Sequence, residues 1–287
     1  MLNFINMISS GQYKNGFQNK KKVEIASLIL SAGKGSRMKG FKGNKTLLPL
    51  IPGASTFEGS HPILLQILNH LPPGPKALVV HHKKEDVLEA TQSLGLTYCE
   101  QPTLNGTGGA LLAARRFFEE NDQGRVIITM GDVPFVQTET YYKLIEALKH
   151  FSLVILGFSS ADKKQYGLLE VDGDEVKKII EWKYWSTFPQ KRQTNLQICN
   201  AGIYAARMKD LMKYLPTLAE RPHIVLKERE GRQTEVEEFF ITDLIELMHQ
   251  EGLKIGYIMA GNEIEVMGVD DLPTLKKAQE IFKTTLS

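Results

Sequence analysis

The chain has 287 residues, of which 42% are hydrophobic and 24% are charged, and its formal net charge is +2. This length suits one large domain or two modest ones, with a sizeable buried core. The balanced charge argues against a general nucleic-acid or membrane surface, so any basic site must be local and the expected partners are small molecules.

Apolar strand-like runs alternate with amphipathic helical runs in the first half of the chain. The predicted strands cover 24–31, 76–82, 96–100, 125–132 and 152–159. The predicted helices cover 61–71, 84–95, 106–120 and 138–150, the last with Thr138 as its N-cap. This order predicts an α/β fold whose mostly parallel, twisted sheet has helices on both faces.

The pattern changes from about residue 160. A β-hairpin is predicted over 166–183, turning at Asp172-Gly173. It is followed by a strand at 196–206, a helix at 237–252, a strand at 254–260 and a last helix at 272–286. We expect a disordered tail at 1–23 and one domain at 24–287. Residues 24–158 would bind the nucleotide, and residues 159–287 would bind the acceptor. The hairpin would be an insertion that helps to bind the acceptor.

The polar start of the chain and its two cysteines indicate the compartment. No apolar stretch is long enough to span a bilayer, and the first two dozen residues do not resemble a signal peptide. Cys99 and Cys199 lie in apolar runs without CxxC spacing, which predicts buried free thiols. A reducing, cytoplasmic setting follows, whereas the oligomeric state is left open.

A glycine-rich basic loop, "SAGKGSRMKGFKGNKTLLPL", follows the first predicted strand. Glycine backbone N–H groups can converge on phosphate oxygens because no Cβ blocks the approach. A Walker A loop would need glycine before Lys45, and a dinucleotide loop would need glycine at Met38, so both motifs fail. Arg37 can chelate a phosphate and Lys45 can supply a point charge. From these residues alone, a flexible basic surface loop remains the alternative.

The segments "LSAGKGSRM" and "KTLLPL" resemble the signature of the sugar-nucleotide pyrophosphorylases and related nucleotidyltransferases. In that family the loop wraps the triphosphate of an NTP. The resemblance implies that Arg37 and Lys45 are catalytic, stabilising the α-phosphate and the departing pyrophosphate. It also implies nucleotide contacts from Ala32, Gly33 and Gly35. Ser31 stands where the family usually has Ala or Gly.

A second segment, "EQPTLNGTGGALLAA", resembles the family's Q-x-x-x-x-G-T-G-H-A motif with the spacing of the uridyltransferase branch. A Gln101 amide can present a donor and an acceptor together to a pyrimidine edge. Gly106 and Thr107 would let the base and ribose pack on backbone. Gly109 replaces the usual histidine. Without the family, these residues would predict an ordinary helix start.

A third segment, "ITMGDVPF", places Asp132 just after a predicted buried strand. Ligands bind at that carboxyl edge in open α/β sheets, and Mg²⁺ prefers carboxylate and phosphate oxygens. The alternative is an Asp that caps the next helix. The family's G-D-x-P motif implies a metal ligand here, and "EVMGVDD" implies that Asp270 is the second. Met130 replaces a frequent tyrosine.

The second half of the chain resembles the N-acetylglucosamine-1-phosphate uridyltransferases. "YGLLEVDGDEVKKIIEWK" matches their hairpin and E-x-K segment, and "CNAGIYAA" matches their asparagine segment. The match implies sugar-phosphate contacts from Gly167, Glu181 and Asn200, and a catalytic Lys183 near the acceptor phosphate. We expect Glu181 and Lys183 to share one face of a strand, although an ordinary surface pair is the alternative.

The resemblance implies an Mg²⁺-dependent nucleotidyltransferase that couples UTP to N-acetylglucosamine-1-phosphate and releases pyrophosphate. Two alternatives stay open: a molybdopterin cytidylyl- or guanylyltransferase, and a non-catalytic domain that binds a nucleotide sugar. Phe239 and Phe240 replace two family tyrosines, which leaves the sugar unsettled. The bifunctional bacterial enzymes continue into an acetyltransferase β-helix that forms trimers. Because this sequence ends at Ser287, we expect neither that activity nor that trimer.

Overall fold

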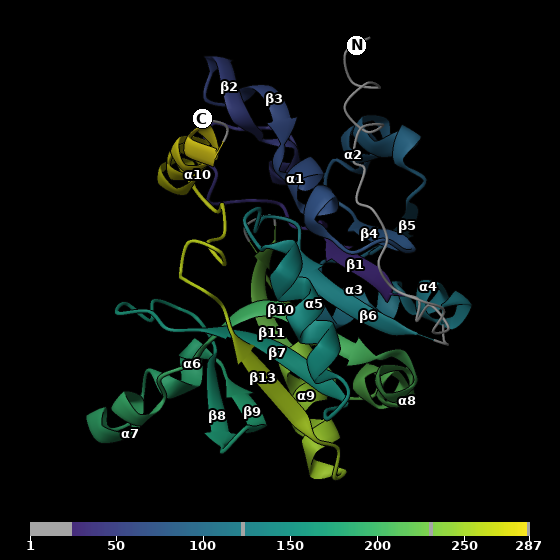
Figure 1. Ribbon diagram of the computed structural model, residues 1–287, viewed down its shortest axis with the longest axis vertical. Helices are drawn as coiled ribbons and strands as arrows, with labels where there is room; N and C mark the ends of the chain where they lie inside the picture. The colour runs from purple at the N-terminus through teal and green to yellow at the C-terminus, as the bar shows by residue number, and fades with distance from the viewer. Residues whose placement is uncertain (1–24, 122–123, 230–231, 286–287) are drawn as a thin grey trace, which may run out of the picture.

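The computed structural model describes residues 25–121, 124–229 and 232–285, so the predicted tail at 1–23 lies outside the described residues. Within them, nine strands form one sheet in the order β5-β4-β1-β6-β10-β7-β13-β9-β8 (Figure 1). The strands are β1 (Ile25–Leu30), β4 (Lys76–Val80), β5 (Thr97–Glu100), β6 (Arg125–Met130), β7 (Leu153–Phe158), β8 (Leu168–Asp172), β9 (Glu175–Ile180), β10 (Cys199–Arg207) and β13 (Ile255–Met259).

The sheet is mixed, because four of its eight neighbouring strand pairs are parallel and four are antiparallel. Strands β5, β4, β1 and β6 pair in parallel, and so do β7 and β13. Strand β10 is antiparallel to β6 and β7, and β9 is antiparallel to β13 and β8. Among the described strands of this sheet, β10 and β9 are therefore the reversed ones. The carboxyl ends of β1 and β6 meet where Leu30 pairs with Met130, which defines the edge that carries the site.

Helices cover both faces of the sheet, as the alternating pattern predicts. Along β1, Ile29 belongs to one apolar core and Leu28 to the other, because successive side chains of a strand point to opposite faces. The first core is covered by α1 (Ile63–His70), α2 (Lys84–Thr91), α5 (Thr138–Ala147) and α10 (Leu272–Thr285). The second is covered by α3 (Gly106–Ala113), α4 (Arg115–Glu120), α8 (Met208–Ala219) and α9 (Ile241–Gln250).

Several element boundaries differ from the predictions: α2 ends at Thr91, α9 begins only at Ile241, and α8 was not predicted. The N-cap of α5 is Gln137, not Thr138, whose hydroxyl donates to the main-chain oxygen of His70 at 2.9 Å. The helix predicted over 106–120 is divided into α3 and α4 at Ala114, whose backbone is not helical. Tertiary packing decided the N-cap of α5, because a Thr beside another element can bond across to it instead of capping its own helix.

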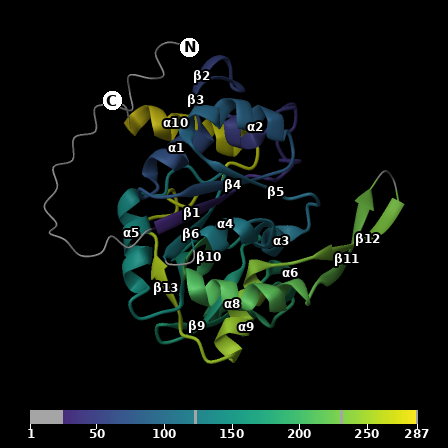
Figure 2. The ribbon, with the colours of Figure 1, turned by 90° about the vertical axis from the view of Figure 1, so that its right-hand side faces the viewer.

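The β-hairpin at the end of the sheet is confirmed, with Gly173 in the left-handed region at φ +64° in its turn. Two further hairpins were not predicted. One pairs β2 (Pro49–Ser55) with β3 (Glu58–Pro62) and lies beside α10 at one end of the molecule (Figure 1). The other pairs β11 (His223–Arg229) with β12 (Arg232–Glu238) and projects from the body (Figure 2).

The β2–β3 hairpin contains prolines and exposed polar residues, so its pattern alone does not predict strands. It is held from the far end of the chain. Gln279 of α10 donates from Nε2 to the main-chain oxygens of Pro49 at 2.8 Å and Thr56 at 2.9 Å. Cys99 and Cys199 are buried free thiols, as predicted. None of the described helices is long and apolar enough to cross a membrane.

Candidate active site

The site forms at the edge where β1 and β6 end side by side. The N–H of Gly131 donates to the main-chain oxygen of Leu30 at 3.0 Å, which holds the two strand ends together. Asp132 follows directly, and the basic loop follows β1. The loop then enters a short 3₁₀ helix, η1 (Lys45–Leu47), that returns Lys45 to the same edge.

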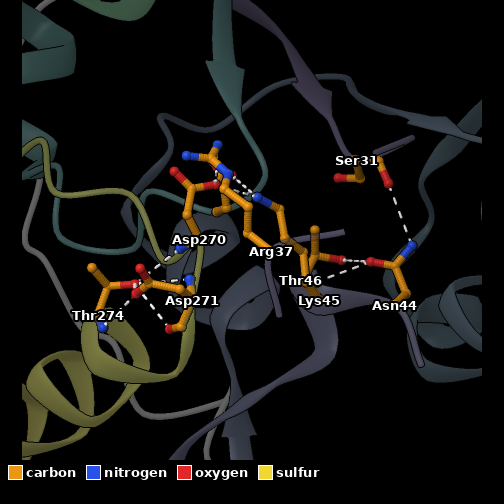
Figure 3. A network of polar contacts seen from close by, with 9 residues as sticks. Ser31, Arg37, Asn44, Lys45, Thr46, Asp270, Asp271 and Thr274 are labelled. Carbon is orange, nitrogen blue, oxygen red and sulfur yellow. Dashed lines mark hydrogen bonds and ion pairs between the residues drawn. The ribbon is translucent and has the colours of Figure 1, made fainter. Parts of the chain in front are cut away.

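Four charged side chains meet at this edge (Figure 3). The Lys45 ammonium donates to a carboxylate oxygen of Asp132 and, at 2.9 Å, to Asp270 Oδ1. The Arg37 guanidinium lies 3.1 Å from the same Asp270 oxygen. The side chains of Lys45 and Asp132 are only 13% and 14% exposed, whereas that of Arg37 is 70% exposed. The enclosed pair is therefore shielded from water, and Arg37 can move.

The two acids act on the Lys45 pKa against its burial. Burial lowers the pKa of this lysine, but the charges and hydrogen bonds of Asp132 and Asp270 outweigh it and raise the pKa above the usual 10.5. Lys45 is therefore fully charged near neutral pH. The four side chains carry two positive and two negative charges, so the cluster is electrically neutral by itself.

Asn44 and Thr46 position Lys45, although sequence reasoning missed them. Asn44 donates from Nδ2 to the main-chain oxygen of His82 at 2.8 Å. Its Oδ1 accepts from the Thr46 N–H at 3.0 Å and from the Thr46 hydroxyl at 2.8 Å (Figure 3). The available signal was an Asn just before the short run that contains Lys45, since Asn is a favoured N-cap.

A second set of hydrogen bonds positions Asp270. The Thr274 hydroxyl accepts from the N–H groups of Asp270 and Asp271, each at 3.0 Å, and the Thr274 N–H donates to Asp271 Oδ1 at 2.9 Å (Figure 3). The Val269 N–H donates to the main-chain oxygen of Asp132 at 2.8 Å. The two acidic segments are therefore joined backbone to backbone before any ligand binds.

A cavity of about 310 Å³ opens on one side of the charged cluster. The predicted residues that line it are Ala32, Gly33, Lys45, Gln101, Gly106, Thr107 and Asp132. Ser31 lines it as well, and its hydroxyl is buried without a hydrogen-bond partner among the described residues.

A second cavity of about 390 Å³ opens on the other side of the cluster. The predicted residues that line it are Arg37, Lys45, Thr107, Asp132, Glu181, Asn200 and Asp270. Lys45, Thr107 and Asp132 line both cavities, as do Leu30 and Met130. The charged cluster therefore lies at the junction of two spaces, as a reaction between two bound molecules requires.

Glu181 and Asn200 lie in the second cavity, and Gly167 packs beside them. Gly167 O accepts from the Asn200 N–H at 2.8 Å, and a Cβ at Gly167 would lie 3.7 Å from Glu181 Oε2. Asn200 donates from Nδ2 to the Tyr204 hydroxyl at 2.9 Å, so its side chain is held. Burial raises the pKa of Glu181, while the nearby hydroxyl of Thr242 opposes the shift. Thr242 and Tyr204, which also line this cavity, were not predicted.

Gly35 and Lys183 line neither cavity. Gly35 adopts φ +59°, and a Cβ there would lie 3.2 Å from the Lys45 Cβ, so this glycine shapes the loop around that lysine. Lys183 belongs to a short helix, α6 (Trp182–Trp185), and Glu181 is its N-cap. The prediction that Glu181 and Lys183 share a strand face is therefore wrong. The chain turns into a helix after β9, and the Lys183 ammonium lies over the Tyr184 ring at 4.8 Å.

Asp132 and Asp270 are the residues that could hold a metal. Both contact one ammonium nitrogen, so they are close enough together to share one cation. Two carboxylates with remaining ligands from phosphate and water suit Mg²⁺. The described residues contain no group of three or more His, Cys, Asp or Glu side chains placed to hold a metal alone. The donor set therefore fits a metal that arrives with phosphate.

Curated relatives resemble the chain along most of its length. It is 31% identical over 263 residues to the bifunctional protein GlmU of Ruegeria sp. (strain TM1040), covering 91% of this chain and 53% of that protein. It is also 31% identical over 273 residues to GlmU of Hydrogenobaculum sp. (strain Y04AAS1), with 90% and 53% covered. The chain thus spans about half the length of these relatives.

Solved nucleotidyltransferases share the fold. One is described as a glucose-1-phosphate thymidylyltransferase from Bacillus anthracis, with TM-score 0.60 and 19% identity, covering 90% of this chain and 94% of that one. Another is a CMP:2-keto-3-deoxy-manno-octonic acid synthetase complexed with CTP, with TM-score 0.60 and 15% identity, covering 91% and 99%. At these identities they show the fold alone.

A protein-family model gives the assignment. It is described as the MobA-like NTP transferase domain, and it matches residues 27–179. The match covers more than half of the 287 residues and includes the basic loop, Gln101 and Asp132. The chain accordingly belongs to the family of MobA-like NTP transferases, and it is a nucleotidyltransferase with the fold of the nucleotide-sugar enzymes.

Proposed function

We propose that this nucleotidyltransferase couples UTP to N-acetylglucosamine-1-phosphate and releases pyrophosphate. The observation that carries the proposal is the shared lining of the two cavities by Lys45 and Asp132. A nucleotide in the first cavity and a sugar phosphate in the second would bring their phosphates together at this junction. In this view residues 24–158 supply most of the nucleotide site, with Glu238 added from the second half.

Positioning and charge neutralisation would supply the catalysis, because phosphoryl-type transfer needs little covalent help. The sugar-1-phosphate oxygen attacks the α-phosphorus in line, the bond to the β-phosphate oxygen breaks, and pyrophosphate departs. A phosphate monoester is already anionic near neutral pH, so no protein group needs to remove a proton. Arg37, whose side chain is exposed, and Lys45 would leave Asp270 and Asp132 to stabilise the departing pyrophosphate.

Asp132 and Asp270 would hold the Mg²⁺ that enters with the nucleotide. The ion would neutralise phosphate charge when bound. The ammonium of Lys45 occupies the place between the same two carboxylates, which supports a cation site there. The cluster of four charged side chains is neutral, so a magnesium nucleotide with its own negative charge would favour the release of Lys45 toward the phosphates.

Glu181 and Asn200 would bind the sugar in the second cavity. Glu181 can accept hydrogen bonds from hydroxyl groups, and Asn200 is held beside it. Lys183 would reach the acceptor phosphate only if the side chain left the rings of Tyr184 and Phe240. We therefore place Lys183 at the rim of the acceptor site, where the side chain must swing inward to contact the acceptor phosphate.

The test is pyrophosphate release with Mg²⁺ over a grid of UTP, dTTP, CTP, GTP and ATP against several sugar-1-phosphates and molybdopterin. We expect release with UTP and N-acetylglucosamine-1-phosphate, abolished by EDTA. Release with CTP or GTP and molybdopterin would instead assign the chain to cofactor synthesis. Silence across the grid, with nucleotide-sugar binding intact by thermal shift, would indicate a non-catalytic binding domain.

A further inference from the structure

The Gln101 amide is held in one orientation at the wall of the nucleotide cavity. Gln101 is 3% exposed, and its Nε2 donates to Asn105 Oδ1 at 2.8 Å and to the main-chain oxygen of Gly106 at 3.1 Å. A main-chain oxygen can only accept, so the nitrogen end of the Gln101 amide must face Gly106, and the oxygen of the Asn105 amide must face Gln101. Both Nε2 hydrogens are thereby used.

The remaining polar atom of this side chain is an acceptor. In the described part of the chain, the Gln101 side chain forms hydrogen bonds through Nε2 alone. The side-chain atoms that are both buried and unpaired there are the hydroxyls of Ser27 and Ser31, so Gln101 Oε1 is not sealed off. Since Gln101 lines the cavity, Oε1 opens toward a ligand. The expectation of a donor and an acceptor together is corrected, because the donor is engaged.

The Asn105 side chain does not cap α3, although its position suggests that role. It is the N-cap of α3, where an Asn side chain commonly accepts a backbone N–H of the first turn. Here it makes no such bond and accepts from Gln101 instead. Its amide also fills the space beside Gly109, because a Cβ at that glycine would lie 1.8 Å from Asn105 Oδ1. Any side chain at position 109, including the histidine usual in the family, is incompatible with this arrangement.

The backbone of Asn105 is held by Phe239, which lies between β12 and α9. The main-chain oxygen of Asn105 accepts from the Phe239 N–H at 2.9 Å, and the Gly108 N–H donates to Phe239 O at 2.8 Å. Gly106 adopts φ +90°, and a Cβ there would lie 2.3 Å from Phe239 O. The segment from Asn105 to Gly108 is therefore held against the Phe239 backbone, and the hydrogen bond to Gln101 orients the Asn105 side chain over Gly109.

We infer that Asn105 is a positioning residue: it occupies a hydrogen of Gln101 Nε2, so that Gln101 offers the nucleobase only its acceptor oxygen. The absence of a side chain at Gly109 leaves the space that Asn105 needs. The inference rests on the proposed function in taking the first cavity as the nucleotide site. Uracil carries one N–H between two carbonyl oxygens, whereas cytosine presents an unprotonated ring nitrogen at that place. The first N–H groups of α3, at Gly106 and Thr107, have no partner within the helix and can serve the carbonyl oxygens. This arrangement of one acceptor and two N–H donors favours the binding of uracil over that of cytosine.

The test is the ratio of the dissociation constants for CTP and UTP, measured by calorimetry with Mg²⁺ and no sugar phosphate. We expect the unsubstituted chain to favour UTP, and Asn105→Ala to reduce the ratio about tenfold, the effect of about 1.4 kcal/mol. Asn105→Asp retains the acceptor oxygen, so most of the ratio should remain. Its negative charge should weaken the binding of both nucleotides alike. Thr103→Ala, an exposed change in the same loop, is the matched control. Asn105→Ala removes one acceptor from the buried Gln101 amide, so we expect its melting temperature to fall by about 2–4 °C while the chain stays folded.

Gly109→Ala supplies an independent arm. Its Cβ displaces the Asn105 amide, so we expect the same loss of the ratio. In the Asn105→Ala background Gly109→Ala should add little, and such non-additivity is a sign of direct coupling. A chain that binds neither nucleotide, or both equally, overturns the inference, as does an unchanged ratio in Asn105→Ala. UTP preference without pyrophosphate release from any sugar phosphate would refute the proposed function and leave the inference standing.

Discussion

The Lys45 ammonium lies 2.9 Å from the carboxylate of Asp270, although the two residues are 225 positions apart in the chain. The same ammonium contacts Asp132, so one lysine joins the ends of three segments: the basic loop, the turn after β6 and the segment before α10. Thr274 and the Val269–Asp132 backbone hydrogen bond hold the acids in place. The two acids are therefore held beside one cationic group without any ligand.

Asp132→Ala tests the proposed metal ligand. We expect turnover to fall at least about a hundred-fold, the scale seen when one group that stabilises a transition state is removed. Steady-state pyrophosphate release with the best substrate pair measures this. Asp174→Ala removes an exposed carboxylate from a turn and should leave turnover unchanged. Near-normal turnover in Asp132→Ala would refute the metal assignment.

Lys45→Met should separate metal binding from catalysis. The substitution removes the ammonium between Asp132 and Asp270, so the two carboxylates lose their internal cation and should bind a divalent ion more tightly. We expect stronger Mn²⁺ binding by calorimetry without nucleotide, and turnover reduced about a hundred-fold by the lost phosphate contact. Lys42→Met, an exposed change in the same loop, should alter neither. Weaker Mn²⁺ binding in Lys45→Met would contradict a shared cation position.

Glu181→Gln should raise the stability of the fold and weaken the binding of the sugar phosphate. Burial holds the pKa of Glu181 above its usual 4.5, so the folded state favours the protonated form and its stability contribution is lost as the pH rises through the folded pKa. At pH 7 we expect Gln to raise the melting temperature by about 2 °C, the scale of about 1 kcal/mol. Well below pH 4.5, where Glu181 is protonated in both states, the gain should vanish.

Activity supplies the second half of that prediction. Glu181→Gln should raise KM for the sugar phosphate with little change in KM for the nucleotide, because Glu181 lines only the second cavity. Exposed Glu89→Gln is the matched control for stability and activity. A melting temperature that falls at pH 7, or a KM that rises for the nucleotide instead, would show that Glu181 is placed wrongly in the proposal.

The two cysteines should be inert in the folded protein. Burial raises the thiol pKa of Cys99 and of Cys199 from 9.0 to about 11, so the reactive thiolate is scarce at pH 8. We expect no alkylation by iodoacetamide at pH 8 until denaturant is added. The free energy of unfolding should fall as the pH rises from 9 to 11, because the unfolded thiols ionise first. A double Cys→Ala variant should show a weaker fall.

Local pattern predicted the strands and helices that contribute most to the core. The strands β1, β4 and β6 are mainly apolar runs, and the helix α1 has apolar residues at helical spacing. Both patterns can be recognised in the sequence without tertiary information. The strands of the β2–β3 hairpin escaped prediction because α10 holds them through Gln279. The prediction that Glu181 and Lys183 share one face of a strand failed for a related reason. Two residues two apart share a face on a strand but not on a helix, and tertiary packing decided which formed.

The sequence by itself determined the family and the types of residue available to the site, because glycines, basic residues and acids at strand ends are legible as ordered motifs. It could not show how those groups are paired. Only the tertiary structure placed Lys45 between Asp132 and Asp270 and turned the Gln101 amide nitrogen toward Asn105 and Gly106. Hydrogen-bond donors and acceptors are assigned by distance and direction, and these depend on how remote segments pack.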